Sequence, residues 1–161
     1  MAVSFCLLLL LLVLVVAFMA ATVALIPKIM VYSAPPDIRE RVRARPDGPG
    51  WKTALGILIA VLLLAGAAAI LVWAGIDAVR NHFSFRQIFL RYLILLEGYK
   101  FFDMFCFDYI LLTKLHIFQH FFPETIGCEG YKKYGFNLKS QLLKVAAFAV
   151  ISFVIAWILS R

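Results

Sequence analysis

Long apolar runs separated by short polar stretches dominate the chain. A helix needs about 20 predominantly apolar residues to cross the hydrocarbon core of a bilayer, and four runs meet this requirement. We place the spans at residues 3–26, 53–73, 85–113 and 142–159. This pattern predicts an all-α polytopic membrane protein, in which a four-transmembrane-helix bundle with short interfacial loop helices forms a single membrane domain over residues 1–161.

The third run differs from the other three because it carries charge where the others carry almost none. Its charged residues at membrane depth form the candidate intramembrane polar site: Glu97, Lys100, Asp103 and Asp108. Ionisable groups inside a bilayer are costly, and they usually face a protein interior or a wet cavity and mark function. The sequence therefore localises a candidate site without naming its chemistry.

The run is too long for an untilted span, so we expect one long tilted helix rather than a helix broken at Gly98. At 100° per residue, Arg86, Glu97 and Asp108 lie on one face of such a helix. Two readings of the polar group stay open. The carboxylates form a proton or cation path or a headgroup site, or they are neutralised by local pairs such as Lys100 with its neighbours at a spacing of three.

Composition supports the membrane assignment. Hydrophobic residues make up 64% of the 161 residues and the mean hydropathy is +0.94, whereas soluble domains are about 45–50% apolar. The net charge of +7 does not indicate nucleic-acid binding, because the cations cluster in short loops beside the apolar runs. There they set topology and contact lipid headgroups.

The same cations predict the orientation. Eleven Lys and Arg residues lie between the first two runs or in the stretch after the third, against four on the opposite side. The positive-inside rule places loops 27–52 and 114–141 in the cytoplasm and both termini outside. The compact size and the lack of an Asn-x-Ser/Thr acceptor favour a bacterial cytoplasmic (inner) membrane.

The first cytoplasmic loop contains a short basic segment in which Ile38 and Val42 share one face at a spacing of four. Arginines alternate through it, and we assign them as candidate lipid-headgroup contacts: Arg39, Arg41, Arg43 and Arg45. The pattern favours a basic helix lying on the inner leaflet. Docking of an acidic partner is the alternative.

The second cytoplasmic loop is rich in aromatic residues and glycine, which predicts an ordered element rather than a flexible tether. Within it, His116 and His120 have the spacing that puts two imidazoles on one helix face, and Glu124 follows. These three residues form a weak candidate metal or headgroup site, since two histidines alone do not make a metal centre. We expect no cofactor, and haem is disfavoured because histidines do not face each other across the bundle.

Small residues are frequent in the second run, in the pairs Gly56/Ala60 and Ala65/Ala69. Such spacing allows close helix approach, so we expect this helix at the centre of the bundle. No hydrolase, phosphate-binding or dinucleotide-binding motif is present in the sequence. The three cysteines are too scattered for a redox pair, and enzyme activity is disfavoured.

Three functions remain, and all are motivated by the polar third run. The favoured one is a small accessory or interaction protein, a subunit or scaffold that binds a larger membrane protein. The second is a homo-oligomeric transporter of protons or small ions that uses carboxylates of the third run. The third is a lipid-modifying enzyme with Asp and His residues near the inner leaflet. The expected partners are the lipid bilayer and either a second copy or a larger membrane protein, and not nucleic acid.

Overall fold

The computed structural model describes residues 2–31, 34–46, 48–133, 135 and 137–161, and every regular element in that part of the chain is helical. In chain order these elements are α1 (Ala2–Leu25), α2 (Pro27–Met30), α3 (Pro36–Arg43), α4 (Gly50–Arg80), α5 (Phe85–Phe102), the π-helix η2 (Asp103–Lys114), α6 (Ile117–Phe121), the 3₁₀ turns η3 (Pro123–Thr125) and η4 (Glu129–Lys132), and α7 (Leu138–Leu159). The all-helical prediction is confirmed.

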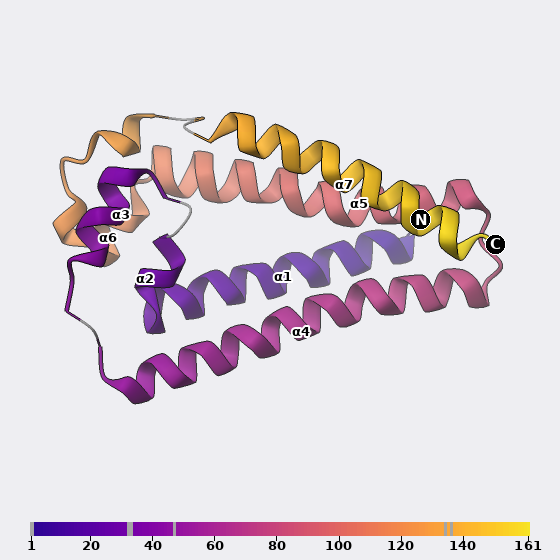
Figure 1. The fold of residues 1–161 in the computed structure, drawn as a ribbon, viewed down its shortest axis with the longest axis horizontal. Coiled ribbons are helices and arrows are strands. Elements are labelled where there is room, and N and C mark those ends of the chain that lie inside the picture. The colour runs from indigo at the N-terminus through magenta and orange to yellow at the C-terminus, as the bar shows by residue number, and fades with distance from the viewer. Residues whose placement is uncertain (1, 32–33, 47, 134, 136) are drawn as a thin grey trace. The chain divides into compact units, whose positions relative to one another are not determined.

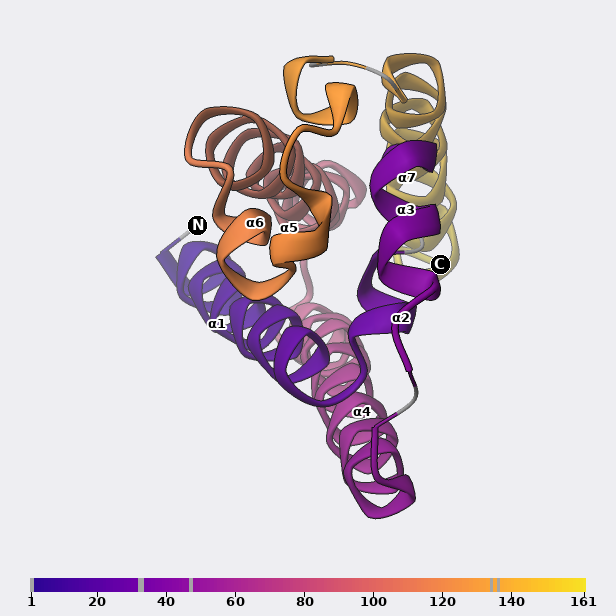
Figure 2. The ribbon, with the colours of Figure 1, turned by 90° about the vertical axis from the view of Figure 1, so that its left-hand side faces the viewer.

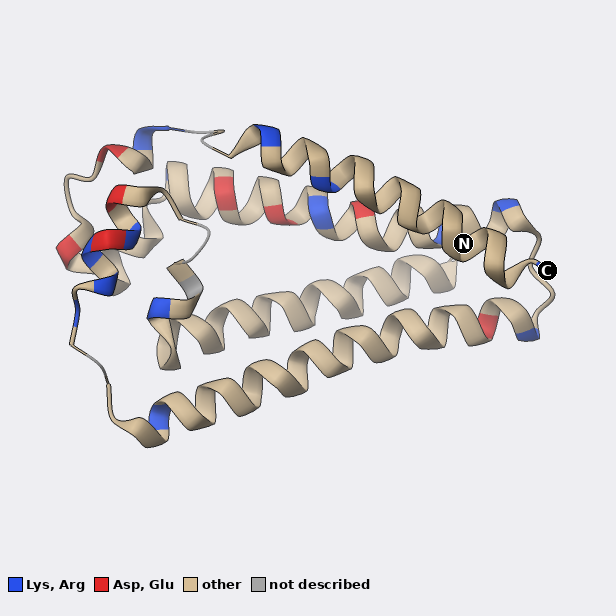
Figure 3. Ribbon diagram, viewed as in Figure 1, with Lys and Arg blue, Asp and Glu red and all other residues tan. Residues whose placement is uncertain are grey.

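Three helices, α1, α4 and α7, are long and apolar enough to cross a membrane. They correspond to three of the four predicted spans. The remaining predicted span, the third at residues 85–113, corresponds to α5 and η2, whose helical backbone continues past Gly98 without a break. Its crossing of a membrane, and with it the count of four spans, stays a prediction. In Figure 3, α1 is free of charged residues, whereas red and blue recur along α5 and η2.

The ends of the long helices follow from local sequence. Pro27 has no backbone N–H and begins the short helix α2, so α1 ends before it at Leu25. At the start of α5, the backbone N–H of Ser84 donates to Gln87 Oε1 at 2.8 Å. This contact is one half of a capping box, which satisfies a backbone group that the helix itself leaves free.

The chain forms two compact units. The first unit comprises Met1–Val15, Leu64–Asp103 and Asn137–Arg161. Within it α5 and α7 lie side by side (Figure 1). The ring of Phe153 on α7 meets Phe85 and Phe89 of α5 edge-on, with centroid distances of 5.3 and 6.4 Å. The buried apolar core of this unit consists of Leu7, Ala74, Ala78, Ile88, Tyr92, Leu95 and Ala156.

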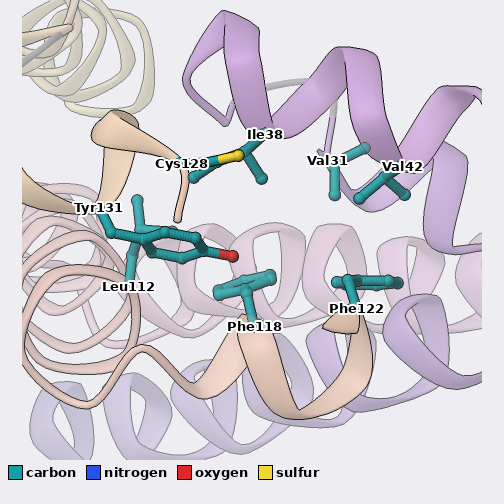
Figure 4. Packing of buried hydrophobic residues seen from close by; sticks show 8 residues of the cluster. All are labelled: Val31, Ile38, Val42, Leu112, Phe118, Phe122, Cys128 and Tyr131. Carbon is teal, nitrogen blue, oxygen red and sulfur yellow. The ribbon is translucent and has the colours of Figure 1, made fainter. Parts of the chain in front are cut away.

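The second unit comprises Val16–Leu63 and Met104–Phe136. Here α2 and α3 lie next to each other in both views (Figures 1 and 2). Figure 4 shows the core of this unit, in which side chains of α3 face the rings of Phe118 and Phe122. The loop from α6 to η4 thus folds against α3, which confirms the expected ordered element; its residues 134 and 136 lie outside the described residues.

The position expected for the second run at the centre of the bundle stays a prediction, and the exposure of α4 differs along its length. Ala65, Ala68 and Ala69 on α4 are all exposed. Close approach does occur at two glycines of this helix. A Cβ at Gly66 would lie 3.3 Å from Leu14 in the first unit, and one at Gly56 would lie 2.8 Å from Ile26 in the second. Glycine therefore allows α4 to pack against the α1–α2 segment, while Ala74 and Ala78 of the same helix are buried in the first unit.

Candidate functional site

Lys100 and Asp103 form a close ion pair within the polar third helix. Lys100 Nζ donates to Asp103 Oδ2 at the spacing of three that the sequence indicates. The lysine is 3% exposed, and the aspartate side chain is 26% exposed. Two opposite charges in direct contact neutralise each other. The pair therefore supports the alternative in which Lys100 and Asp103 stabilise the fold rather than bind a ligand.

Glu97 is different, because its carboxyl oxygens are shielded although the residue as a whole is partly exposed. Neither oxygen has a hydrogen-bond partner among the described residues, although both are shielded from solvent. The next residue, Gly98, lies against α1, where an added Cβ would come within 2.8 Å of Leu8. A carboxylate buried in this way is costly unless it binds a proton or a cation. Among the residues of the predicted site, Glu97 is therefore the one whose carboxyl oxygens are shielded with no hydrogen-bond partner in the described part of the chain.

Asp108 lies in the π-helix, which changes the geometry assumed from the sequence. In η2 the hydrogen bonds run over five residues: Leu115 N donates to Ile110 O at 2.8 Å, and Thr113 Oγ1 donates to Asp108 O, also at 2.8 Å. A π-helix advances by a smaller angle per residue than an α-helix. The alignment of Arg86, Glu97 and Asp108 at 100° per residue therefore does not hold beyond Phe102.

The most completely coordinated charge in the first unit is Arg91, which is 1% exposed. Its guanidinium donates to Asp77 Oδ2 at 2.6 Å, to the Ala74 carbonyl at 3.0 Å and to Ser4 Oγ at 3.3 Å. Its Cζ atom also lies 4.5 Å from the centroid of the Phe83 ring. One side chain thus connects α1, α4 and α5.

Sequence reasoning missed this clamp. Arg91 lies within the predicted third span and Asp77 just beyond the predicted second span, and the two were not connected. A signal was present, because Arg91 is flanked by the apolar residues Leu90 and Tyr92, and Asp77 follows Ile76 near the end of an apolar run. A charge in such a setting needs a counter-ion, but the sequence does not say which one.

In the second unit, hydrogen bonds fix the segment from α6 to η4 (residues 117–132) to α3. The N–H of Gly130 donates to Asp37 Oδ2 at 2.8 Å, and Arg41 donates to the carbonyl of Glu124 at 2.9 Å. The hydroxyls of Thr125 and Tyr131 lie 2.6 Å apart. The first two contacts join segments more than 80 residues apart, and with the third they hold residues 117–132 on α3 as a folded platform.

The four arginines on α3 and just after it were predicted to contact lipid headgroups, and two of them contact protein in the structure. Arg41 binds the Glu124 carbonyl as described, and Arg45 Nε lies 3.7 Å from Glu124 Oε1. Arg39 and Arg43 also take part in interactions. The apolar face of α3 is covered by protein, since Ile38 and Val42 are fully buried in the core of Figure 4. Headgroup contact by these arginines stays a prediction.

His116, His120 and Glu124 do not share one helix face. His116 has a left-handed backbone (φ 47°) and precedes α6, whereas His120 lies within it. The His116 ring packs on Tyr131 and the His120 ring on Phe121. Glu124 instead lies near Arg45, and no group of three potential metal ligands occurs in the described part of the chain. The helical spacing assumed from the sequence is wrong because the chain turns at His116.

Cys128 is buried in the same platform. Burial raises the pKa of its thiol, and the negative charge of Asp37 adds to this effect, although Arg41 acts in the opposite direction. The thiolate is the reactive form of cysteine, so at neutral pH Cys128 is a neutral packing residue. Burial likewise raises the pKa of the Tyr131 hydroxyl. Neither group is poised for covalent catalysis.

Comparison of the chain with family models, with curated proteins and with solved structures finds no match. Its function must therefore be argued from its own residues.

Proposed function

We propose that this chain is a small integral membrane accessory protein, a subunit or scaffold that binds a transmembrane helix of a larger membrane protein. The observation that carries the proposal is an open apolar groove of about 720 Å³ in the first unit. Residues of α4, α5 and α7 line it, among them Val72, Ile76, Leu96 and Ile155. Two of these helices are long and apolar enough to span a membrane, so the groove opens towards lipid or towards another helix.

A hydrogen bond and a close contact at Gly75 hold the wall of the groove together. The Tyr92 hydroxyl donates to the Leu71 carbonyl at 2.7 Å. A Cβ at position 75 would lie 2.8 Å from this hydroxyl and 3.2 Å from Leu159, so only glycine lets the ring lie this close to α4. A preformed groove requires less ordering when a partner binds than a flexible one does.

A helix fits this surface better than disordered lipid tails. Lipid tails are as apolar as leucine, so helices associate in membranes through close packing at small residues. Exposed Ala65 and Ala68 lie on the same face of α4 as Val72 and Ile76. A partner helix can approach the α4 backbone at the alanines and continue along the groove.

The polar residues of the first unit support an interaction role for this surface. Arg91 and Lys100 are paired within the chain, so they offer no free charges to a cargo. The groove itself is lined by apolar side chains apart from Arg80 and the Tyr92 hydroxyl. A surface of this kind selects a partner by shape and packing rather than by charge.

The proposed setting combines this groove with the charge pattern of the sequence. We place four spans in a bacterial cytoplasmic membrane, with α5 and η2 as the third. Loops 27–52 and 114–141 face the cytoplasm, and both termini lie outside, because most loop cations fall in those two loops. A second copy of the chain is the alternative partner for the groove.

A photo-crosslinking amino acid placed at single positions in the native membrane tests this proposal. Val72 in the groove and Val13 on α1 are well matched, since they are 61% and 64% exposed. We expect a discrete crosslinked protein from position 72 and only diffuse lipid products from position 13. Equal labelling of the same protein from both positions, or lipid products alone at position 72, would refute the groove as the binding surface.

Glu97 favours a second candidate, a homo-oligomeric transporter of protons or small ions. Its buried carboxyl group has no partner among the described residues, and an isolated group of this kind must hold a proton or a cation. Proteoliposomes loaded with a pH-sensitive dye test it. Transport predicts proton uptake that is lost in Glu97→Gln and kept in the control Glu129→Gln, whose glutamate side chain is 66% exposed. Absence of uptake by the unmodified protein excludes proton transport.

A further inference from the structure

One charged side chain lies at the end of the apolar groove of the first unit. Among the residues that line the groove, Arg80 is the one that carries a charge. It is the last residue of α4, and Leu159, the last residue of α7, lines the same groove. In Figure 3, α4 is tan over most of its length, and red and blue lie close together near its end. The groove is therefore apolar along its length and positively charged where α4 ends.

The positive charge of Arg80 is not neutralised within the first unit. Its side chain is exposed and makes no ion pair or hydrogen bond with the described residues. The oxygens of Asp77, the acid nearest to it in sequence, accept from Arg91 and from Asn81 instead. Of the other two acids, one is paired with Lys100 and the oxygens of the other are shielded from solvent. These are all the acidic side chains of the unit: Asp77, Glu97 and Asp103.

A helix that fills the groove changes the surroundings of this charge. It removes water from the side of the Arg80 guanidinium that it covers, and a charge that loses water without gaining a counter-ion is unfavourable. A carboxylate on the helix offsets this loss, because a guanidinium binds a carboxylate through two parallel N–H···O bonds. Packing along the apolar stretch thus favours a helix, and the charge at the end sets the position of that helix along the groove.

We infer that the partner helix carries an acidic residue that pairs with Arg80 and fixes the register of the helix in the groove. This inference rests on the proposed function, since it concerns the helix that the groove binds. Arg80 follows the exposed Ala68 by 12 residues, which corresponds to about 18 Å along α4. The carboxylate of the partner therefore lies about 18 Å along its axis from the position that packs on Ala68.

Zero-length crosslinking of the full-length protein in its native membrane tests this pairing. A water-soluble carbodiimide activates a carboxylate, and an amine in direct contact displaces the resulting urea to form an amide bond. Arg80→Lys keeps the positive charge and supplies the amine. Arg86→Lys is the matched control, because Arg86 is also exposed, lies near the beginning of α5 and does not line the groove.

Peptide mapping of the products identifies the residue that is joined to position 80. We expect an Asp or Glu of the same polypeptide that is photo-crosslinked from Val72, and little or no such product from Arg86→Lys. An adduct at position 80 with a lipid or with a second copy of this chain would overturn the inference, because the carboxylate would then not come from a helix of another protein.

Removal of the charge gives a second measurement. Arg80→Gln should lower the yield of the photo-crosslink from Val72 by about 3- to 10-fold, whereas Arg86→Gln should leave the yield unchanged. If the photo-crosslink persists but position 80 gives no adduct, or if both variants lose yield equally, the pairing is wrong and the groove remains a helix-binding surface. If Val72 gives no discrete product, the proposed function and this inference both fail.

Discussion

Replacing Asp77 by asparagine removes the counter-ion of the buried Arg91 with almost no change in shape. In the structure Asp77 Oδ2 accepts from Arg91 at 2.6 Å, and its Oδ1 accepts from Asn81 Nδ2 at 3.0 Å. The Arg91 side chain is 2% exposed and that of Asp77 is 22% exposed. The substitution therefore leaves a guanidinium inside the first unit without a negative partner.

The expected loss follows from the geometry. Breaking a buried ion pair by removing one partner costs about 3–5 kcal/mol. Partial exposure of Asp77 and the remaining bonds from Arg91 to Ala74 and Ser4 reduce this, so we expect Asp77→Asn to lower the free energy of unfolding by about 2–4 kcal/mol. The double variant Asp77→Asn/Arg91→Met should lose less unfolding free energy than the sum of the two single variants. Each single variant leaves one charged side chain without its partner, whereas the double variant leaves none.

Unfolding of the purified protein in mild detergent, followed by circular dichroism against denaturant, measures these differences. Arg86→Met is the matched control, because Arg86 lies on the same helix, is exposed and makes no ion pair within the described residues. The control should change the free energy of unfolding by less than about 0.5 kcal/mol. An Asp77→Asn effect no larger than that of the control, or strict additivity in the double variant, would refute the view that Arg91 clamps α1, α4 and α5.

Three further experiments test other parts of the fold. Gly130→Ala places a Cβ 2.5 Å from a side-chain carbon of the segment preceding α3; it should loosen the platform and increase hydrogen exchange over residues 117–132, and unchanged exchange would contradict the packing. Maleimide labelling in the folded protein should be slow at Cys128 and fast at exposed Cys6, and the Cys128 rate should rise only at pH above the ordinary thiol range because its pKa is raised; equal rates at pH 7.5 would contradict its burial. Tyr92→Phe removes the bond to the Leu71 carbonyl and should lower the free energy of unfolding by about 0.6–1.7 kcal/mol; no change in a denaturant melt would show that this bond does not hold the groove wall.

Those features that depend on local pattern could be predicted from the sequence. Hydropathy alone located α1, α4 and α7, because an apolar run long enough to cross a membrane is expected to form a helix. The spacing of three predicted local pairing of Lys100 with Glu97 or Asp103, and the structure shows the pair with Asp103. The density of aromatic residues in the loop after η2 indicated order, and the packing of Phe118 and Phe122 explains why.

Features that depend on distant or irregular geometry could not be predicted in this way. The Arg91–Asp77 pair joins two helices, and a single sequence gives no means to choose its partners. The predicted alignment of Arg86, Glu97 and Asp108 used 100° per residue throughout the third run. This angle does not apply in the π-helix that begins at Asp103. The histidine pair failed for a related reason, because His116 adopts a left-handed backbone that composition does not reveal.

Glu97 separates the two candidate functions at a single residue. The proposal of an accessory protein assigns no role to this carboxyl group, whose two oxygens are shielded from solvent. A transporter requires it to exchange a proton or a cation. Loss of proton uptake in Glu97→Gln, with the native fold retained, would therefore favour transport. Proton uptake that is unchanged in Glu97→Gln would exclude this carboxyl group from transport.

Native mass spectrometry of the protein extracted from its own membranes in mild detergent tests the central claim most directly. The account predicts a stoichiometric complex with a second membrane polypeptide, and Ile76→Trp, which fills the groove, should abolish that complex. The matched substitution Val13→Trp on α1 should leave it intact. A protein that is found only by itself or with identical copies, or a complex that survives Ile76→Trp unchanged, would contradict the account.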